Sequence, residues 1–509
     1  GFGRLVHSIG VSVETDRPEE TAEFVFQMYG KKDLYGGGTN LTTSLKCDGM
    51  EHRIYLSDYR WTEDDHVPGQ IKILFAAPER MGKVSVRLFL NDGYEAPPEE
   101  EDLVIDMHSE EYCGMISRSL LQLGNPYRIR KAIEKSKAGK EVTLAYIGGS
   151  ITQGAGAIPI HTECYAYKSF QLFQNRFSTQ NNVRFIKAGV GGTPSELGMI
   201  RFDRDVLREG ERPDIVVIEF AVNDEGDETK GVCYESLVRK VLKLPWKPAV
   251  VLLFSVFAND WNLQERLRPV GDLYDLPMVS IRDAVTPQFS LKCGEGRILS
   301  KNQFFYDIFH PNNTGHTIMA DCLQYLFERC DAAEPARVGT FVEGMTEEQI
   351  LSEKLSGPAV IGADFERIFL LDKKNRYVGA KIRAGSFTST DMELQSVEMD
   401  GNLIQTPEFP YNWMYDGSRP QMAGFEMEII CKSLFLIFKD SGETDVGKAN
   451  VFVNDVYCMT ADPHKNNWLH CNAVLLFWET ESRSHKVRIA VTEEDRNKKF
   501  TILGFGYTI

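Results

Sequence analysis

Ser150 and His310 are the residues of this chain whose types and surroundings could carry nucleophilic chemistry. Ser150 follows an apolar run at residues 142–147 and two glycines. Asp307 stands three residues before His310, so its carboxylate can bond one imidazole nitrogen and leave the other for a serine hydroxyl. A serine hydroxyl is a good nucleophile only when a base takes its proton. The sequence therefore predicts Ser150 as nucleophile, His310 as base and Asp307 as the carboxylate that orients the base.

Each of these patterns, taken singly, is more often structural than catalytic. A serine after a strand commonly caps the next helix, and an aspartate three residues before a histidine often occurs by chance. Two further segments favour the catalytic interpretation, because they can supply donors to an oxyanion. The run 185–188 leads into a turn at 189–193, whose backbone N–H groups can point into a site, and the run 214–220 is followed by Asn223, whose amide can donate.

Strand-like and helical segments alternate between residues 125 and 335. The strand-like runs lie at 142–147, 183–186, 214–220 and 249–254, and helical segments lie near 126–138, 234–242 and 314–329. This alternation predicts an α/β fold with a doubly wound parallel sheet. Ligands bind at the carboxyl ends of the strands in such sheets, so Ser150, the glycine turn and Asn223 are expected at one edge.

The regions on either side show short runs with period-two alternation, separated by turn residues. These runs are 53–57, 71–75 and 84–90 before the α/β region, and 425–430, 434–438, 451–453 and 486–490 after it. Such spacing is typical of antiparallel β-sandwiches. We expect two jelly-roll-like β-sandwiches, an N-terminal one at 1–124 and a C-terminal one at 341–509, on either side of the catalytic α/β domain at 125–335.

Taken in order, the four segments resemble the sequence blocks of the SGNH (GDSL-type) hydrolase superfamily. The matching stretches are Gly148-Gly149-Ser150-Ile151-Thr152, Ala188-Gly189-Val190-Gly191-Gly192-Thr193, Ala221-Val222-Asn223-Asp224 and Asp307-Ile308-Phe309-His310-Pro311. The resemblance implies an SGNH-type fold and places Gly192 at the oxyanion glycine. With Gly192 so placed, the predicted oxyanion hole consists of the Ser150 and Gly192 N–H groups and the Asn223 side chain.

Three positions depart from the pattern of this superfamily. Gly149 stands where many members have Asp, Lys187 where many have Asn, and Ala221 where many have Gly. The longer stretches around Ser150 and Asn223 are most similar to bacterial acetylesterases that remove acetyl groups from plant glycans, several of which carry a β-sandwich beside the catalytic domain. The resemblance thus implies a carbohydrate acetylesterase with an accessory domain.

Several function classes are excluded or disfavoured by composition and motifs. The formal net charge is −16 and no long basic run is present, which disfavours nucleic acid and anionic membrane surfaces as partners. Pro194 stands where a dinucleotide fingerprint needs glycine, and no phosphate-loop motif occurs. No cluster has metal-ligand spacing, so neither a metal nor another cofactor is predicted. We expect His316 to be a helix-surface or capping residue and Glu219 to be a structural carboxylate inside an apolar strand.

The ten cysteines are scattered, without a CxxC pair, which favours a reducing compartment. A cytoplasmic enzyme is therefore expected, and a secreted form whose signal was removed before Gly1 remains an alternative.

The sequence as a whole predicts a serine esterase that removes acetyl groups from carbohydrate. A lipase- or thioesterase-like enzyme on longer acyl esters and a glycan-binding protein with a vestigial hydrolase domain remain alternatives. Trp413 and Tyr415 lie in a turn-rich, polar segment and are predicted to contribute to a glycan-binding surface. On this view the region 341–509 serves recognition of acetylated oligosaccharide and is dispensable for small aryl acetates. The oligomeric state, the sugar and the acetyl position are not indicated.

Overall fold

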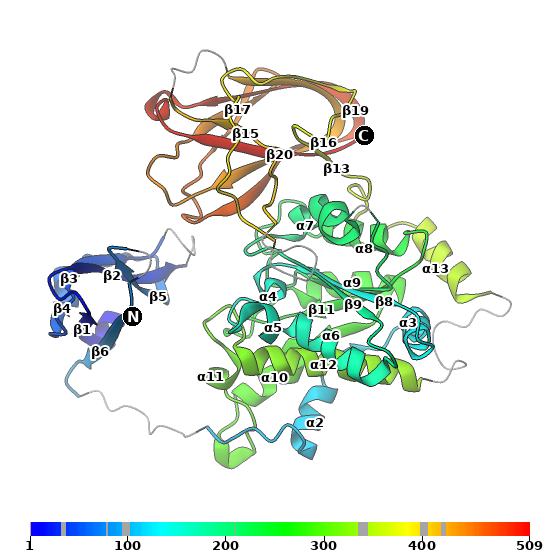
Figure 1. Ribbon diagram of the computed structural model, residues 1–509, viewed down its shortest axis with the longest axis horizontal. Helices are drawn as coiled ribbons and strands as arrows, with labels where there is room; N and C mark the ends of the chain where they lie inside the picture. The colour runs from blue at the N-terminus through cyan, green and yellow to red at the C-terminus, as the bar shows by residue number, and fades with distance from the viewer. Residues whose placement is uncertain are drawn as a thin grey trace. The chain divides into compact units, whose positions relative to one another are not determined.

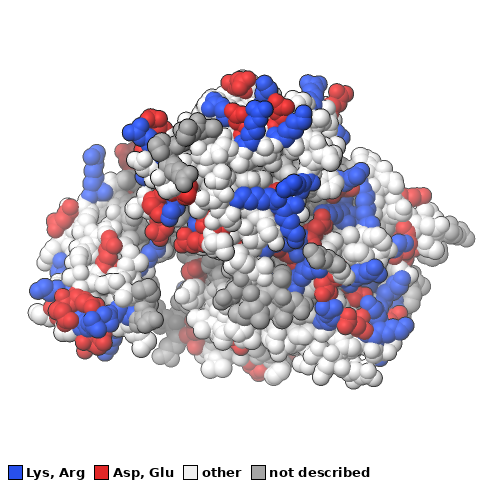
Figure 2. All heavy atoms as spheres, turned by 45° about the horizontal axis from the view of Figure 1, so that its top comes forward, with Lys and Arg blue, Asp and Glu red and all other residues white. Residues whose placement is uncertain are grey.

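The computed structural model contains two compact units, Gly1–Glu100 and Glu101–Ile509 (Figure 1). It describes residues 2–31, 37–77, 80–93, 102–208, 210–333, 345–397, 406–418 and 424–509. Among these residues, no helix combines the length and the apolar character that crossing a membrane requires. Acidic and basic side chains are interspersed on the face shown in Figure 2.

The first unit contains two three-stranded antiparallel sheets, with strand orders β4-β1-β6 and β3-β2-β5. The strands are β1 (Val6–Thr15), β2 (Thr21–Gly30), β3 (Asn40–Lys46), β4 (His52–Tyr55), β5 (Asp65–Phe75) and β6 (Gly82–Leu90). Apolar side chains of both sheets, such as Val11 and Phe24, share one core. The expected sandwich-like β structure of this region is therefore present.

The second unit contains a six-stranded sheet with the order β7-β12-β11-β10-β8-β9. Its strands are β7 (Leu120–Gln122), β8 (Val142–Gly148), β9 (Val183–Gly189), β10 (Ile215–Glu219), β11 (Ala249–Phe254) and β12 (Met278–Ser280). All pairs are parallel except that of β7 with β12. Every residue of β8, β10 and β11 is buried, as expected for strands covered on both faces. The predicted doubly wound α/β fold is confirmed.

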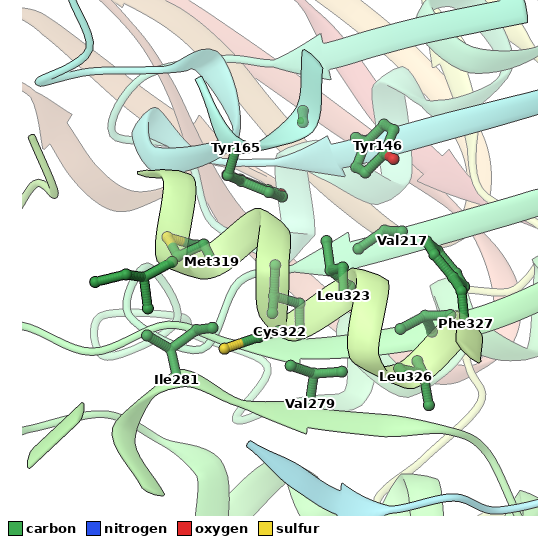
Figure 3. Close-up of a cluster of buried hydrophobic side chains, with 14 of the residues drawn as sticks. Tyr146, Tyr165, Val217, Val279, Ile281, Met319, Cys322, Leu323, Leu326 and Phe327 are labelled. Carbon is green, nitrogen blue, oxygen red and sulfur yellow. The ribbon is translucent and has the colours of Figure 1, made fainter. Parts of the chain in front are cut away.

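Helices cover both faces of this sheet. They are α2 (Glu110–Ser117), α3 (Tyr127–Lys137), α4 (Ser150–Gln153), α5 (Ile160–Glu163), α6 (Tyr165–Phe177), α7 (Ser195–Phe202), α8 (Val232–Leu242), α9 (Gln264–Tyr274), α10 (Ile281–Phe289), α11 (Lys301–Phe304), α12 (Asn313–Ala332) and α13 (Glu347–Ser356). Alternate residues of β8 divide between two cores: Tyr146 packs with α6 and α12, whereas Ile147 packs with α7 and α8. Figure 3 shows Leu323 and Phe327 of α12 on the first of these faces, beside Val217 of β10.

The segment from Asp102 to Gly124 packs with the α/β region. The sequence pattern instead predicts that it belongs to the N-terminal β-sandwich. α2 contributes Tyr112 and Met115 to the same core as α12, and β7 pairs with β12 at the edge of the six-stranded sheet. β7 spans only three residues, Leu120–Gln122, and shows no period from which its partner could be inferred.

The C-terminal region is an eight-stranded antiparallel structure. Its strands are β13 (Phe369–Leu371), β14 (Ala380–Arg383), β15 (Trp413–Tyr415), β16 (Phe425–Asp440), β17 (Ala449–Val453), β18 (Val456–Ala461), β19 (His470–Val491) and β20 (Phe500–Thr508). The first half of β16 pairs with β14 and its second half with β20, while β19 follows it throughout. Because β16 changes partner, the strands wrap around one apolar core that includes Phe425 and Leu436. The expected second sandwich-like region is confirmed.

Candidate active site

Ser150 lies at the carboxyl end of β8 and is the first residue of α4. The buried strand β8 ends at Gly148, and the chain turns through Gly149 into the short helix. Ser150 is half-buried, and its Oγ lies 2.9 Å from Nε2 of His310. This distance is within hydrogen-bond reach for proton transfer from a hydroxyl to an imidazole.

His310 and Asp307 lie in the loop between α11 and α12. His310 Nδ1 lies 2.9 Å from Asp307 Oδ2 and 3.0 Å from Oδ1. The backbone N–H groups of Phe309 and His310 also donate to Asp307 Oδ1, at 2.7 and 2.8 Å. Burial pushes the pKa of Asp307 upward, but the hydrogen bonds from His310 and these two N–H groups outweigh it and hold the pKa below its ordinary value. The carboxylate is thus kept ionised beside the ring that it orients.

Asn223 lies just beyond β10, next to the residue that precedes Ser150. An ideal Cβ on Gly149 would lie 2.3 Å from Asn223 Oδ1 and 2.5 Å from Nδ2. The amide group therefore fills the space that a side chain at 149 would need. Glycine at position 149, where many members of the superfamily have Asp, therefore leaves room for Asn223 to approach the start of α4.

Gly192 lies in the turn between β9 and α7 and has a φ of +70°. This left-handed conformation favours glycine. An ideal Cβ on Gly192 would lie 2.8 Å from the Trp468 ring, so the indole packs directly against this glycine. Trp468 lies in the loop that leads into β19 of the C-terminal sandwich, so the turn is covered by a residue from outside the six-stranded sheet.

Comparison with known proteins assigns this part of the chain. The GDSL-like lipase/acylhydrolase family matches over residues 146–318, which include Ser150, Gly192, Asn223, Asp307 and His310. Residues 146–318 are a GDSL-like lipase/acylhydrolase domain. By this assignment the protein is a carboxylic ester hydrolase. Among curated proteins, none matches the sequence.

Two similar solved structures are of a two-domain esterase active on acetylated mannans. One of them, co-crystallised with mannopentaose, is 24% identical with a TM-score of 0.60, and the match covers 77% of this chain and 98% of that chain. The other is 23% identical with a TM-score of 0.62 and the same coverage. At this level of identity the likeness shows a shared fold.

Lys187 of the GDSL-like domain stands at a position where the sequence departs from the superfamily pattern. Its side chain is fully buried, and Nζ donates to the backbone carbonyl of Gln153 at 3.0 Å. Gln153 is the last residue of α4. Lys187 thus connects β9 to the helix that begins with Ser150.

Glu219 and His316 are buried near the site. Burial raises the pKa of Glu219 to about 7, against the hydrogen bond that Thr152 Oγ1 donates at 3.1 Å. His316 is not on the helix surface as expected: it is fully buried, its Nδ1 accepts from Tyr165 N and its Nε2 donates to Ala155 O, both at 3.1 Å. Burial lowers its pKa to about 4. These contacts are structural.

Trp413 and Tyr415 lie in β15, and their predicted place on a glycan-binding surface is wrong. Their exposed fractions are 5% and 1%, and both pack in the core of the C-terminal sandwich. The prediction rested on the turn-rich sequence after residue 415, whereas β15 pairs with β20 and is thereby part of the sheet. Trp468, 41% exposed, is the aromatic residue of this region that lies at the site.

Gln395 and His470 also reach the glycine turn and carry no local sequence signal. Both belong to the C-terminal sandwich: Gln395 Nε2 donates to Gly191 O at 2.8 Å, and His470 Nε2 donates to Gly192 O at 3.1 Å. In the part of the chain that the structure describes, no group of three or more His, Cys, Asp or Glu residues is arranged to hold a metal ion.

Proposed function

We propose that this protein is a serine esterase that removes O-acetyl groups from carbohydrate, with Ser150, His310 and Asp307 as its catalytic residues. The observation that carries the proposal is the continuous chain of contacts from Ser150 Oγ to His310 Nε2 and from His310 Nδ1 to Asp307. Such a chain supplies a nucleophile, a base and an orienting carboxylate in the order that ester hydrolysis requires.

The reaction would proceed through an acetyl-enzyme. Ser150 Oγ attacks the acetyl carbonyl carbon while His310 Nε2 takes its proton. The tetrahedral oxyanion is bound by the N–H groups of Ser150 and Gly192 and by the Asn223 amide. Collapse breaks the bond to the sugar oxygen, which receives the proton from His310. Water, deprotonated by His310, then attacks acetyl-Ser150, and acetate leaves as the proton returns to Oγ.

A carbohydrate substrate is supported by two features. The two-domain esterase with the similar fold is active on acetylated mannans. In addition, the indole of Trp468 is partly exposed and lies against Gly192, so a flat aromatic surface stands beside the proposed oxyanion hole. Aromatic rings bury large area at low entropic cost and stack well on sugar faces. The acyl group would enter beside Ser150 and the sugar would extend toward Trp468.

The deciding experiment is a series of aryl esters from acetate to octanoate, together with acetate release from acetylated mannooligosaccharide. We expect the highest kcat/KM on the acetate and no turnover by Ser150→Ala. A maximum at longer chains would instead identify a lipase- or thioesterase-like enzyme, and full activity of a folded Ser150→Ala protein would reject the mechanism. No turnover of any ester by the wild type would leave only a vestigial hydrolase domain.

The role of Trp468 is tested by Trp468→Ala. This change should lower kcat/KM on the acetylated oligosaccharide more than on aryl acetate. Trp478→Ala is the matched control, because Trp478 is 42% exposed and packs on Phe365. If Trp468→Ala and Trp478→Ala changed kcat/KM on the oligosaccharide equally, Trp468 would have no specific role in substrate recognition.

A further inference from the structure

Two successive carbonyl groups of the glycine turn are held by side chains from the C-terminal sandwich. Gln395 Nε2 donates to Gly191 O at 2.8 Å, and His470 Nε2 donates to Gly192 O at 3.1 Å. The residues that donate lie more than 200 positions away in the sequence from the residues that accept. We propose that Gln395 and His470 are positioning residues that fix the direction of the Gly192 N–H toward the oxyanion.

The argument rests on the proposed function of Gly192 and on the planarity of the peptide bond. The Gly191 carbonyl and the Gly192 N–H belong to one rigid planar unit and point in opposite directions in the trans form. A hydrogen bond that fixes the carbonyl therefore fixes the N–H. Glycine on both sides leaves this peptide little intrinsic preference for one orientation, so external contacts determine it.

The contact with Gln395 orients this peptide directly. The carboxamide of Gln395 is itself oriented, because its Oε1 accepts from the Cys471 N–H at 2.9 Å. Because the Cys471 N–H needs an acceptor, Gln395 Oε1 must face it, and Gln395 Nε2 then faces Gly191 O. The side chain is largely buried, which strengthens the bond by excluding water. Donation to the carbonyl also polarises the peptide and makes its N–H a stronger donor.

His470 holds the next peptide in the same manner. The Asp440 carboxylate lies 2.9 Å from His470 Nδ1, on the opposite side of the ring from Gly192 O. Asp440 is fully buried and also accepts from Asn466 Nδ2 and Asn472 Nδ2. Because both ring nitrogens face acceptor oxygens, the ring donates to both in its doubly protonated form, which fixes its orientation and directs Nε2 at the Gly192 carbonyl.

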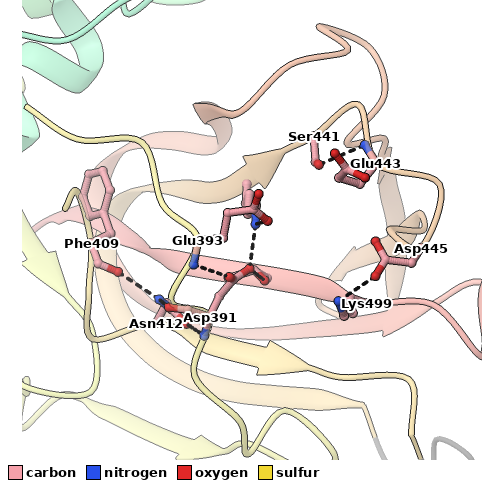
Figure 4. Close-up of polar contacts among 10 residues, drawn as sticks. Asp391, Glu393, Phe409, Asn412, Ser441, Glu443, Asp445 and Lys499 are labelled. Atoms are coloured by element: carbon pink, nitrogen blue, oxygen red, sulfur yellow. Dashed lines mark hydrogen bonds and ion pairs between the residues drawn. The ribbon is translucent and has the colours of Figure 1, made fainter. Parts of the chain in front are cut away.

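Both positioning residues are anchored at the end of β16. Asp440 orients His470, and the preceding residue, Lys439, donates from Nζ to Asp391 and Glu393, at 3.1 Å in each case. Figure 4 shows Asp391 and Glu393 on one segment, and Gln395 is two residues further along the sequence. Two consecutive buried residues of one strand thus support the two donors that reach the GDSL-like domain.

The consequence is that the C-terminal sandwich contributes to turnover and not only to recognition. This differs from the expectation that the region 341–509 is dispensable for small esters. An aryl acetate needs the oxyanion hole as much as an oligosaccharide does, so disturbing either donor should lower kcat on both substrates.

The test uses the full chain with aryl acetate at pH 8 and compares Gln395→Met with Gln395→Glu. Methionine keeps the length but cannot donate, whereas an ionised glutamate still accepts from Cys471 N–H and cannot donate to Gly191 O. Each should lower kcat by about 10- to 100-fold with little change in KM, a part of the roughly 10²- to 10³-fold loss expected when a whole oxyanion donor is removed. Unchanged kcat in either folded variant would overturn the proposal.

His470 is tested by comparing His470→Ala with His470→Gln. The glutamine Nε2 can reach the position of the imidazole Nε2, so it should restore much of the kcat that alanine loses. Equal losses in the two folded variants would reject a donor role for His470. Far-ultraviolet circular dichroism and thermal melts verify that each variant is folded.

Glu366→Gln and Ser150→Ala separate the possible causes of a loss. Glu366 pairs with Arg239 of α8 and with Lys243, the residue after that helix, and it has no contact with the glycine turn among its hydrogen bonds and ion pairs in the described chain. Its variant should retain wild-type kcat, and an equal fall there would assign the effect to general loosening and contradict the proposal. Activity in Ser150→Ala would reject the proposed function itself, whereas an inactive Ser150→Ala with unaffected Gln395 variants would reject only the positioning role.

Discussion

Asn223 occupies the space in which a side chain of residue 149 would have to lie. An ideal Cβ on Gly149 would approach Asn223 Oδ1 to 2.3 Å, far inside van der Waals contact. The glycine immediately before Ser150 and the amide after β10 are therefore matched to each other. Any side chain at 149 must displace the amide, move α4, or do both.

Gly149→Ala should lower kcat on aryl acetate by about 10-fold or more, because the displaced amide loses its aim at the oxyanion. Steady-state kinetics measure this change. Gly114→Ala is the matched control: Gly114 lies in α2 with nothing within 4 Å of its ideal Cβ, so alanine should leave kcat unchanged. If Gly149→Ala kept the wild-type kcat, displacement of the Asn223 amide would not impair catalysis.

Asn223→Ala should reduce kcat by about 10²- to 10³-fold with little change in KM, as is usual for one oxyanion donor. The amide has no function in substrate binding in the proposed mechanism, so its loss acts on the transition state. Measuring kcat and KM separately on aryl acetate distinguishes the two effects. A rise in KM at constant kcat would make Asn223 a substrate-binding residue instead.

Asp307→Asn should lower kcat by roughly 10³- to 10⁴-fold while the protein remains folded, because the amide no longer stabilises the protonated base and can favour the wrong tautomer. The side chain is partly exposed, so little stability should be lost. Asp331→Asn, which removes an exposed ion pair with Lys137, is the control and should be active. Near wild-type turnover in Asp307→Asn would exclude Asp307 from the catalytic residues.

Glu219→Gln should stabilise the protein at pH 8 and change little at pH 4. The folded-state pKa of about 7 lies above the ordinary value of 4.5, so the folded state binds a proton that the unfolded state has released. The associated stability is present below about pH 4.5 and is lost as the pH rises toward 7. A pKa shift of this size corresponds to roughly 3 to 4 kcal/mol. Glutamine can still accept from Thr152.

Urea unfolding of wild type and Glu219→Gln at several pH values measures this difference. Glu134→Gln, at a carboxylate that is 67% exposed, is the control and should show the wild-type pH dependence. If Glu219→Gln retained the full pH dependence of the wild type, ionisation of Glu219 would not contribute to it.

The parts of this structure that could be predicted from sequence are those with local signals. The buried strands β8 and β10 are mostly apolar runs, with glycine at the end of β8 and Asn223 four residues after β10, and Ser150 and His310 lie in short recognisable blocks. The N-terminal and C-terminal β regions were recognised from alternation, but the pairing of β7 was not, because three residues show no period.

The contribution of the C-terminal sandwich to the site could not be predicted in the same way. Gln395 lies outside the regular elements, and His470 is a single histidine at the start of β19, so only the folded chain shows that both meet the glycine turn. Trp413 illustrates the opposite error: polar, turn-like neighbours predicted an exposed ring, whereas pairing with β20 buries it.

The two donors to the glycine turn have a consequence for the order in which the protein becomes active during synthesis. The six-stranded sheet and its covering helices up to α12 are complete at Ala332, with Ser150, Asn223 and His310 already made. The side chains that hold the Gly191 and Gly192 carbonyls are added later, at 395 and 470, and β16 must be in place to support them. A ribosome-bound chain that ends before residue 470 would therefore carry the proposed nucleophile and base without both of the side chains that hold the Gly191–Gly192 turn. Full turnover would begin only when the last sheet has closed over the glycine turn.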